Sequence, residues 1–190
     1  KNPLGTKGAR ITMHIGLPGR YLVYLPTSSE TFISRRIENE TERTRLKTIL
    51  QETENLGGGY IVRTAGQECE KIDFEPDLDF LHRLWERLQK KAEKTPPCNI
   101  LYEDLNLTFR SMRDLVTSDV ARVVVDSKLE YQSCLKFCKD YLPHIYDNIE
   151  LSQEPAPIFD HFGIEIEINR ALDRKVWLKS GGYILIEQTE

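Results

Sequence analysis

The chain has 190 residues, of which 39% are hydrophobic, so it is long enough to form one or two domains around an apolar core. No stretch approaches the roughly 18 consecutive apolar residues that a membrane span needs, and the N-terminus lacks the apolar core of a signal peptide, so we expect a folded cytoplasmic protein. The net charge of −4 argues against strong indiscriminate binding to nucleic acid, because such binding normally needs a basic surface.

Short strands and one helix are expected in the first third of the chain. The β-prone residues 10–15 and 21–25 flank the turn sequence Gly16-Leu17-Pro18-Gly19, which predicts a hairpin. Residues 41–50 are rich in helix formers, and their apolar side chains recur at helical spacing, which predicts a helix. After Gly57-Gly58-Gly59, residues 60–62 predict a short buried strand that leads directly into Arg63.

A longer helix is expected from residue 77 to about residue 94. Pro76 is well placed to open this helix, and Thr95-Pro96-Pro97 ends it and predicts a domain boundary. Beyond the prolines the expected order is a strand at 100–102, a helix at 106–116, a strand at 122–125, a helix at 128–141, a loop with Pro155 and Pro157, a helix at 164–172, and strands at 176–178 and 183–187. This alternation predicts an α/β second half after a small mixed first half, an α+β and α/β fold class.

Charge is distributed unevenly along the chain. Residues 1–47 contain nine Lys or Arg and four Glu, a net charge of +5, which leaves −9 for the remaining residues. A polyanion should therefore prefer the N-terminal quarter. A solvated charged face is the competing explanation.

Three local features contain groups that bind anions. Arg63 and Thr64 follow an apolar strand, and a guanidinium beside a hydroxyl can donate several hydrogen bonds to one phosphate. The turn within residues 16–23 offers backbone N–H groups for an anion-binding nest, and Ser34-Arg35-Arg36 is a compact basic group. Each feature has a plain alternative. An arginine that closes a strand is more often a surface salt-bridge residue, a hairpin turn needs no ligand, and a basic group can simply lie in solvent.

Taken together and in this order, several segments resemble the ribonuclease E/G family. The matching segments are Gly5-Thr6-Lys7-Gly8-Ala9, the hairpin at 17–26, Ile33-Ser34-Arg35-Arg36-Ile37, Ile61-Val62-Arg63-Thr64-Ala65-Gly66, residues 77–85, Ser180-Gly181-Gly182-Tyr183 and Gln188-Thr189-Glu190. They run from one end of the chain to the other, so the resemblance is specific.

The resemblance implies a modular chain that is a fragment of a longer enzyme, as the absence of an initiating Met at Lys1 also suggests. Residues 1–13 resemble the C-terminal end of an S1 RNA-binding domain, and residues 14–108 resemble a 5′-sensor domain. Residues 109–171 resemble an RNase H-like subdomain, which in this family is structural. Residues 172–190 resemble the start of a DNase I-like catalytic subdomain.

The resemblance also assigns residues to RNA. Arg63 and Thr64 match the side-chain ligands of a 5′-monophosphate, and Gly19 matches the backbone that closes the pocket. Val23 matches the residue that packs against the first base, Lys7 matches a basic RNA contact, and Arg35 is expected as an auxiliary contact. The implied partner is single-stranded RNA with a 5′-monophosphate.

Metal ions are expected only in the full-length enzyme. The resemblance implies Mg²⁺-binding aspartates and, further along, cysteines of a zinc link, and both lie beyond Glu190. We therefore expect neither catalytic residues nor a zinc site in this fragment. The cysteines are expected to be reduced core thiols and not zinc ligands: Cys69, Cys98, Cys134 and Cys138.

The predicted function is that of an RNA-binding fragment of an endoribonuclease of RNA processing and decay, inactive in cleavage by itself. The alternative is a non-catalytic scaffold of the same enzyme, which supplies packing and the contacts of a homo-oligomer.

A nuclease site within the fragment would need carboxylates whose spacing is more typical of a solvated helix face: Asp160, Glu165, Glu167, Asp173 and Glu187. The histidines form no catalytic cluster in the sequence: His14, His82, His144 and His161. The segments that separate the E type from the G type are not in this sequence.

Overall fold

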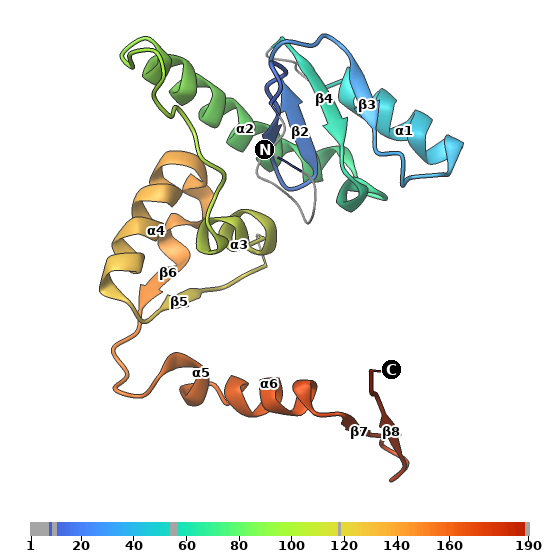
Figure 1. Ribbon diagram of the computed structural model, residues 1–190, viewed down its shortest axis with the longest axis vertical. Coiled ribbons are helices and arrows are strands. Elements are labelled where there is room, and N and C mark those ends of the chain that lie inside the picture. The colour runs from blue at the N-terminus through green and yellow to red at the C-terminus, as the bar shows by residue number, and fades with distance from the viewer. Residues whose placement is uncertain (1–7, 9–10, 54–56, 118, 189–190) are drawn as a thin grey trace. The chain divides into compact units, whose positions relative to one another are not determined.

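The computed structural model describes residues 8, 11–53, 57–117 and 119–188. The chain divides into two compact units, and Figure 1 shows the helices and strands in the order of the chain. The first unit runs to Asp119 and also contains Phe137–Tyr146, and the second unit consists of Val120–Lys136 and Asp147–Glu190. The first unit thus continues past Pro96 and Pro97, where the sequence predicts a boundary.

A four-stranded sheet forms the centre of the first unit (Figure 1), in the order β1 (Leu17–Pro18), β2 (Leu22–Leu25), β4 (Gly59–Val62), β3 (Thr31–Ile33). β2 is antiparallel to β1 and to β4, whereas β3 and β4 are parallel. The start of β2 therefore lies at the same edge of the sheet as the ends of β3 and β4. We call this place the Arg63 edge, after the residue that follows β4.

One face of this sheet contributes to the core of the unit. Leu22 and Tyr24 of β2 and Tyr60 and Val62 of β4 are buried, because alternate residues of a strand point to the same face. Helix α2 (Lys71–Ala92) packs against β2. Its buried side chains are Phe74, Asp77, Leu78, Phe80, Leu81 and Leu84. Each fully buried large apolar side chain contributes about 1.5–3 kcal/mol.

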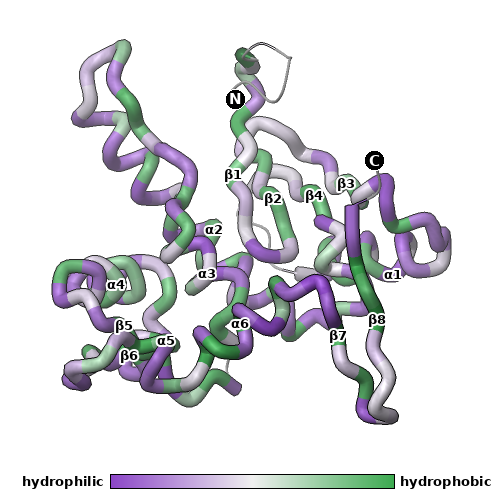
Figure 2. The backbone as a smooth tube through the Cα atoms, turned by 60° about the horizontal axis from the view of Figure 1, so that its bottom comes forward, coloured by the Kyte–Doolittle hydropathy of each residue, from purple (hydrophilic) through white to green (hydrophobic). Residues whose placement is uncertain are grey.

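Helix α1 (Glu40–Gln51) contacts β3 and confirms the helix predicted at 41–50. Asn39 caps its start, since its Oδ1 accepts the N–H groups of Thr41 at 2.9 Å and Glu42 at 3.1 Å. Much of the helix is hydrophilic, whereas β2 and β4 are hydrophobic (Figure 2). The helix thus buries a narrow stripe with Leu46 and Leu50, and leaves Glu40 and Lys47 exposed to solvent.

The start of α2 differs from the prediction. The helix begins at Lys71, so Pro76 lies inside it and does not open it. The Asp73 carboxylate accepts the Glu70 N–H at 2.8 Å and so caps the helix upstream of the proline. Proline removes one backbone hydrogen bond near the N-terminus, and the burial of the apolar stripe outweighs that loss.

The predicted hairpin exists but is displaced along the chain. Residues 11–15 form no strand, and β1 occupies part of the predicted turn, so the observed turn is Gly19–Tyr21. Ile11 and Met13 are 98% and 93% exposed, which explains why their apolar side chains do not fix a strand here. The strand predicted at 100–102 is also absent from those described residues.

Further helices and 3₁₀ turns belong wholly or in part to the first unit. Helix α3 (Leu107–Leu115) confirms the prediction at 106–116, with Asn106 as its N-cap. The 3₁₀ turn η1 (Thr64–Gly66) follows β4, and η2 (Pro143–Asn148) follows helix α4 (Lys128–Tyr141), whose bounds are those predicted.

The second unit contains two small sheets. β5 (Val123–Val125) pairs in parallel with β6 (Ile149–Leu151), and α4 lies between them in the sequence, as in an α/β unit. Two helices follow, α5 (Ile158–His161) and α6 (Ile164–Leu172), and then the antiparallel hairpin of β7 (Lys175–Trp177) and β8 (Tyr183–Leu185). The predicted helix at 164–172 and the two final strands are confirmed. Mixed helices and strands give the predicted α+β class, and no described helix is long and apolar enough to cross a membrane.

Candidate functional site

The Arg63 edge brings together the three features that the sequence singles out separately. Leu22 of β2 pairs with Val62 of β4, and the Arg63 N–H donates to the Tyr21 oxygen at 2.7 Å. The Ser34 N–H donates to the Val62 oxygen at 2.8 Å, which brings the end of β3 to the same place. The hairpin turn, Ser34 with the two arginines after it, and Arg63 with Thr64 are therefore neighbours.

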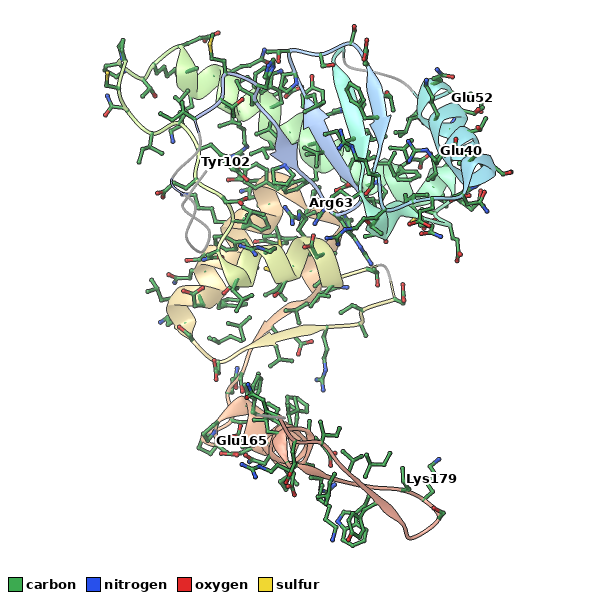
Figure 3. The ribbon with its side chains drawn as sticks, turned by 45° about the vertical axis from the view of Figure 1, so that its right-hand side comes forward. Glu40, Glu52, Arg63, Tyr102, Glu165 and Lys179 are labelled. Carbon is green, nitrogen blue, oxygen red and sulfur yellow. The ribbon has the colours of Figure 1, made fainter. Side chains whose placement is uncertain are left out.

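The Arg63 side chain, labelled in Figure 3, is half-buried and is anchored to the hairpin turn. Its Nη1 donates to the Gly19 oxygen at 2.5 Å and to the Arg20 oxygen at 3.0 Å. Within the described chain it forms no ion pair, and its Nε and Nη2 donate to no described acceptor. The surface salt bridge that spacing alone favours is thus not formed among these residues, and two guanidinium nitrogens can serve an anion.

Two hydroxyl groups lie next to the guanidinium-bearing residue. Thr64 is exposed at the start of η1, and its Oγ1 lies 3.1 Å from the Ser34 Oγ. Either hydroxyl can donate in this pair, so one of them is always able to offer its proton to a third group. Because Ser34 follows β3 and Thr64 follows β4, the parallel pairing of the two strands produces this contact.

The predicted anion-binding nest exists, but an internal carboxylate occupies it. Asp77 of α2 accepts the N–H of Arg20 on Oδ1 at 2.7 Å and the N–H groups of Tyr21 and Leu22 on Oδ2 at 2.8 Å each. The Gly19 N–H donates to the Leu22 oxygen at 2.8 Å. The turn therefore offers no unpaired N–H group at residues 19–22, which corrects the interpretation of the turn as an open phosphate nest.

Asp77 is only 5% exposed, and burial raises the pKa of its carboxyl while the three N–H donors oppose that shift. The carboxylate also explains why residue 19 is a glycine. A Cβ atom at Gly19 would lie 2.3 Å from the Asp77 Oδ1, far inside van der Waals contact. Gly19 thus permits the carboxylate to approach the turn.

The remaining RNA contacts implied by the resemblance lie around this edge. Val23 is half-buried on β2, one residue beyond Leu22, and its side chain belongs to the sheet face opposite the buried one. Arg35 is exposed next to Ser34. Lys7 lies outside the described residues. The structure therefore brings Arg63, Thr64 and Gly19 together, with Val23 and Arg35 nearby in the same strands and loops.

Comparison with known proteins identifies the family. The chain matches the ribonuclease E/G family over residues 16–190. It belongs to the ribonuclease E/G family. It is 43% identical to ribonuclease G of Escherichia coli, 40% identical to ribonuclease G of Haemophilus influenzae and 38% identical to ribonuclease E of Nostoc sp., in each case along the whole chain. The chain spans 39% of the length of both ribonuclease G relatives and 28% of the ribonuclease E relative.

The family resemblance implies Mg²⁺, and the described part of this ribonuclease E/G chain offers that ion no cluster of carboxylates. Among the described residues, no three His, Cys, Asp or Glu side chains come together in a group that would hold a metal ion. Glu167 pairs with Arg170 at 2.5 Å, and Glu187 lies 3.8 Å from Arg174. Glu167 and Glu187 thus form exposed ion pairs, and we derive no metal-dependent step from the acidic residues of this region.

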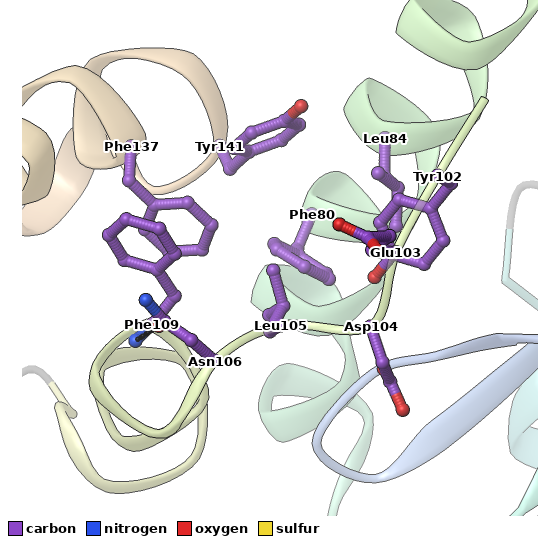
Figure 4. A pocket seen from close by; sticks show the side chains of 10 residues that line it. All are labelled: Phe80, Leu84, Tyr102, Glu103, Asp104, Leu105, Asn106, Phe109, Phe137 and Tyr141. Carbon is purple, nitrogen blue, oxygen red and sulfur yellow. Dashed lines mark hydrogen bonds between the residues drawn. The ribbon is translucent and has the colours of Figure 1, made fainter. Parts of the chain in front are cut away.

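A separate apolar pocket of about 340 Å³ is shown in Figure 4. Its walls include Phe109 and Phe137, whose rings stack with centroids 4.5 Å apart, and Phe80 and Tyr141. The Tyr102 hydroxyl is buried without a described hydrogen-bond partner, and burial raises its pKa to about 12. None of the residues that the sequence assigns to RNA lines this pocket.

Two side chains that bind the backbone of the β1–β2 hairpin escaped the sequence prediction. Asp77 lies on the stripe of Phe74, Leu78 and Leu81, where a buried acid among apolar residues is a detectable signal. Arg113 of α3 is 7% exposed, and its Nη1 donates to the Pro18 oxygen at 2.7 Å. No periodicity reveals that second contact, because it joins residues far apart in the chain.

Proposed function

We propose that this chain is the RNA-binding part of an endoribonuclease of RNA processing and decay, and that it recognises the 5′-monophosphate of single-stranded RNA. Membership of the ribonuclease E/G family supports the RNA substrate and the parent activity. The observation that carries the finer assignment is the meeting of Arg63, Thr64 and Ser34 at one sheet edge, with two guanidinium nitrogens unpaired among the described residues.

In the proposed complex the phosphate oxygens accept hydrogen bonds from the donors that have no partner among the described residues. Nε and Nη2 of Arg63 form charge-assisted hydrogen bonds to phosphate oxygens, and the Thr64 hydroxyl adds a third. The Gly19 N–H joins them only by exchanging the Leu22 oxygen for a phosphate oxygen. Val23 packs against the first base, and Arg35 and Lys7 contact RNA at the margins.

The small number of donors supports selection for a monophosphate. A 5′-triphosphate brings further charged oxygens, and the described donors of this edge are too few to bind them all. A 5′-hydroxyl leaves the anchored guanidinium without an acceptor, which loses the charge-assisted bonds of the complex. The Arg63 edge thus favours one state of the RNA end through the number and the charge of its donors.

We assign binding, and no cleavage step, to residues of this chain. In the full-length homo-oligomeric enzyme, the family resemblance implies that Mg²⁺ supports the hydrolysis, with the bound 5′ end holding a downstream segment near the metal site. Because binding and cleavage are separate in this proposal, Arg63 and Thr64 act in the selection of the substrate.

A second candidate function is that of a structural scaffold of the same enzyme. The second unit exposes many apolar side chains, among them Leu172 of α6 and Trp177 of β7, and β8 is hydrophobic in Figure 2. Such a surface suits packing against another part of the protein or another subunit. Sedimentation at increasing concentration tests this role, which is compatible with RNA binding by the first unit.

The proposed function is tested by titrating the chain with short RNAs that differ only at the 5′ end. We expect the monophosphate to bind more tightly than the triphosphate or the hydroxyl. Thr64→Val keeps the shape of an exposed side chain and removes its hydroxyl, so it should reduce the preference without unfolding the protein. Equal affinities for the three RNA ends would refute the sensor assignment.

A further inference from the structure

The sheet face opposite the buried one carries a continuous row of apolar side chains. Pro18 pairs with Val23 across β1 and β2, Val23 pairs with Ile61 across β2 and β4, and Ile61 pairs with Phe32 across β4 and β3. Paired residues of neighbouring strands share a face, so these four side chains form one line across the sheet. Phe32, at the end of the line, is 45% exposed.

A groove lies beside the end of this row that Phe32 and Ile61 form. Its lining includes Phe32 and Ile61 of the sheet and Arg43, Thr44 and Lys47 of α1, and it encloses about 650 Å³. Ser34 and Arg35 also line it, so the groove is continuous with the Arg63 edge through Ser34, which contacts Thr64.

The charges of the groove favour an anion. Arg35 and Lys47 are exposed and pair with no carboxylate in the described part of the chain. Arg43 is half-buried and already has partners in the protein, since its Nη1 donates to the Ser34 and Ile37 oxygens and its Nε lies 3.5 Å from the Glu40 carboxylate. Two exposed cations therefore remain available at a groove whose one acidic lining residue, Glu40, is already paired with Arg43.

We infer that single-stranded RNA runs from the Arg63 edge along this row, with a downstream base stacked on Phe32 and the backbone phosphates beside Arg35 and Lys47. This inference rests on the proposed function, because it takes the 5′-phosphate at Arg63 as the start of the path. An exposed aromatic ring on a sheet beside a basic groove is a combination that binds unpaired bases and their phosphates. The path from Val23 to Phe32 crosses two strand spacings, roughly 10 Å.

The test compares 5′-monophosphorylated RNAs of one and of five nucleotides by fluorescence anisotropy. Phe32→Ala should weaken binding of the five-nucleotide RNA about five- to tenfold, at the lower end of what loss of one stacked base costs, and leave the single nucleotide unaffected. Phe32→Tyr keeps the ring and should bind as the parent chain does. Phe159→Ala removes a phenylalanine of similar exposure in the second unit and should change nothing.

Two further measurements distinguish failure of the RNA path from failure of the 5′-sensor assignment. Phe32→Leu keeps apolar bulk on the strand, so it reports the loss of stacking even if the alanine variant folds poorly. The same RNAs with a 5′-hydroxyl separate the two proposals. A preference for the monophosphate with no effect of Phe32→Ala or Phe32→Leu overturns the path and leaves the sensor standing. An effect of Phe32 without any 5′-end preference supports the groove as an RNA site and refutes the sensor.

Discussion

Replacing Asp77 with asparagine should both destabilise the first unit and weaken recognition of the 5′ end. The carboxylate accepts three backbone N–H groups of the hairpin turn, two of them on Oδ2. An amide has one acceptor oxygen, so at least one N–H would face the NH₂ group. A hydrogen bond to a charged group contributes about 1.5–3 kcal/mol, and the lower cost of burying a neutral side chain offsets part of the loss. We therefore expect the free energy of unfolding to fall by about 2 kcal/mol.

The effect on recognition follows from the anchoring of Arg63. Its Nη1 binds the oxygens of Gly19 and Arg20, so a displaced turn also displaces the guanidinium. Urea unfolding followed by circular dichroism measures the stability, and titration with 5′-monophosphate and 5′-hydroxyl RNAs measures the preference. Asp79→Asn is the matched control, since Asp79 is exposed on the same helix and pairs only with Arg83, a bond of about 0.3–0.5 kcal/mol. If both variants behave alike, Asp77 does not organise the turn.

Three other outcomes are expected. Gly19→Ala should lower the free energy of unfolding, measured in urea, by about 1–3 kcal/mol, because the new Cβ would displace the Asp77 carboxylate. A stability equal to that of the parent chain would contradict the close approach of Asp77 to the turn. Hydrogen bonds from the Arg45 side chain lower the pKa of Glu42 to about 2 from 4.5, so the stability that Glu42 contributes should be present above pH 4.5 and be lost as the pH falls towards 2. Glu42→Gln should therefore make the free energy of unfolding less dependent on pH in this range, and an unchanged pH profile would rule this out. Tyr102→Phe removes a buried hydroxyl without a described partner, so thermal unfolding should show equal or slightly higher stability, and a clear loss would reveal a missing partner.

Helices with a strong apolar period could be predicted from the sequence alone. α1, α4 and α6 occupy nearly the predicted residues, because the side-chain pattern within each segment is sufficient to place it. β3 and β6 were not predictable. Each has three residues and a parallel partner distant in the chain, and neither has the run of valines that marks β5 in the sequence.

The candidate site, too, has parts that the sequence predicts and parts that appear only in the folded chain. Arg63 and Thr64 are detectable as a polar pair after a buried strand, but spacing alone favours a surface salt bridge for the arginine, and only the family resemblance assigns it to phosphate. The role of Asp77 depends on a contact across more than fifty residues, which no local pattern contains. The parallel pairing of β3 with β4, which brings Ser34 to Thr64, likewise appears only in the folded chain.

The central claim is that the Arg63 edge binds the terminal phosphate of RNA. A crystal structure of the chain with a 5′-monophosphorylated dinucleotide tests this claim most directly. We predict the terminal phosphate within hydrogen-bonding distance of Nε or Nη2 of Arg63 and of the Thr64 hydroxyl. A phosphate bound elsewhere, with the Arg63 nitrogens still unoccupied, would contradict the account.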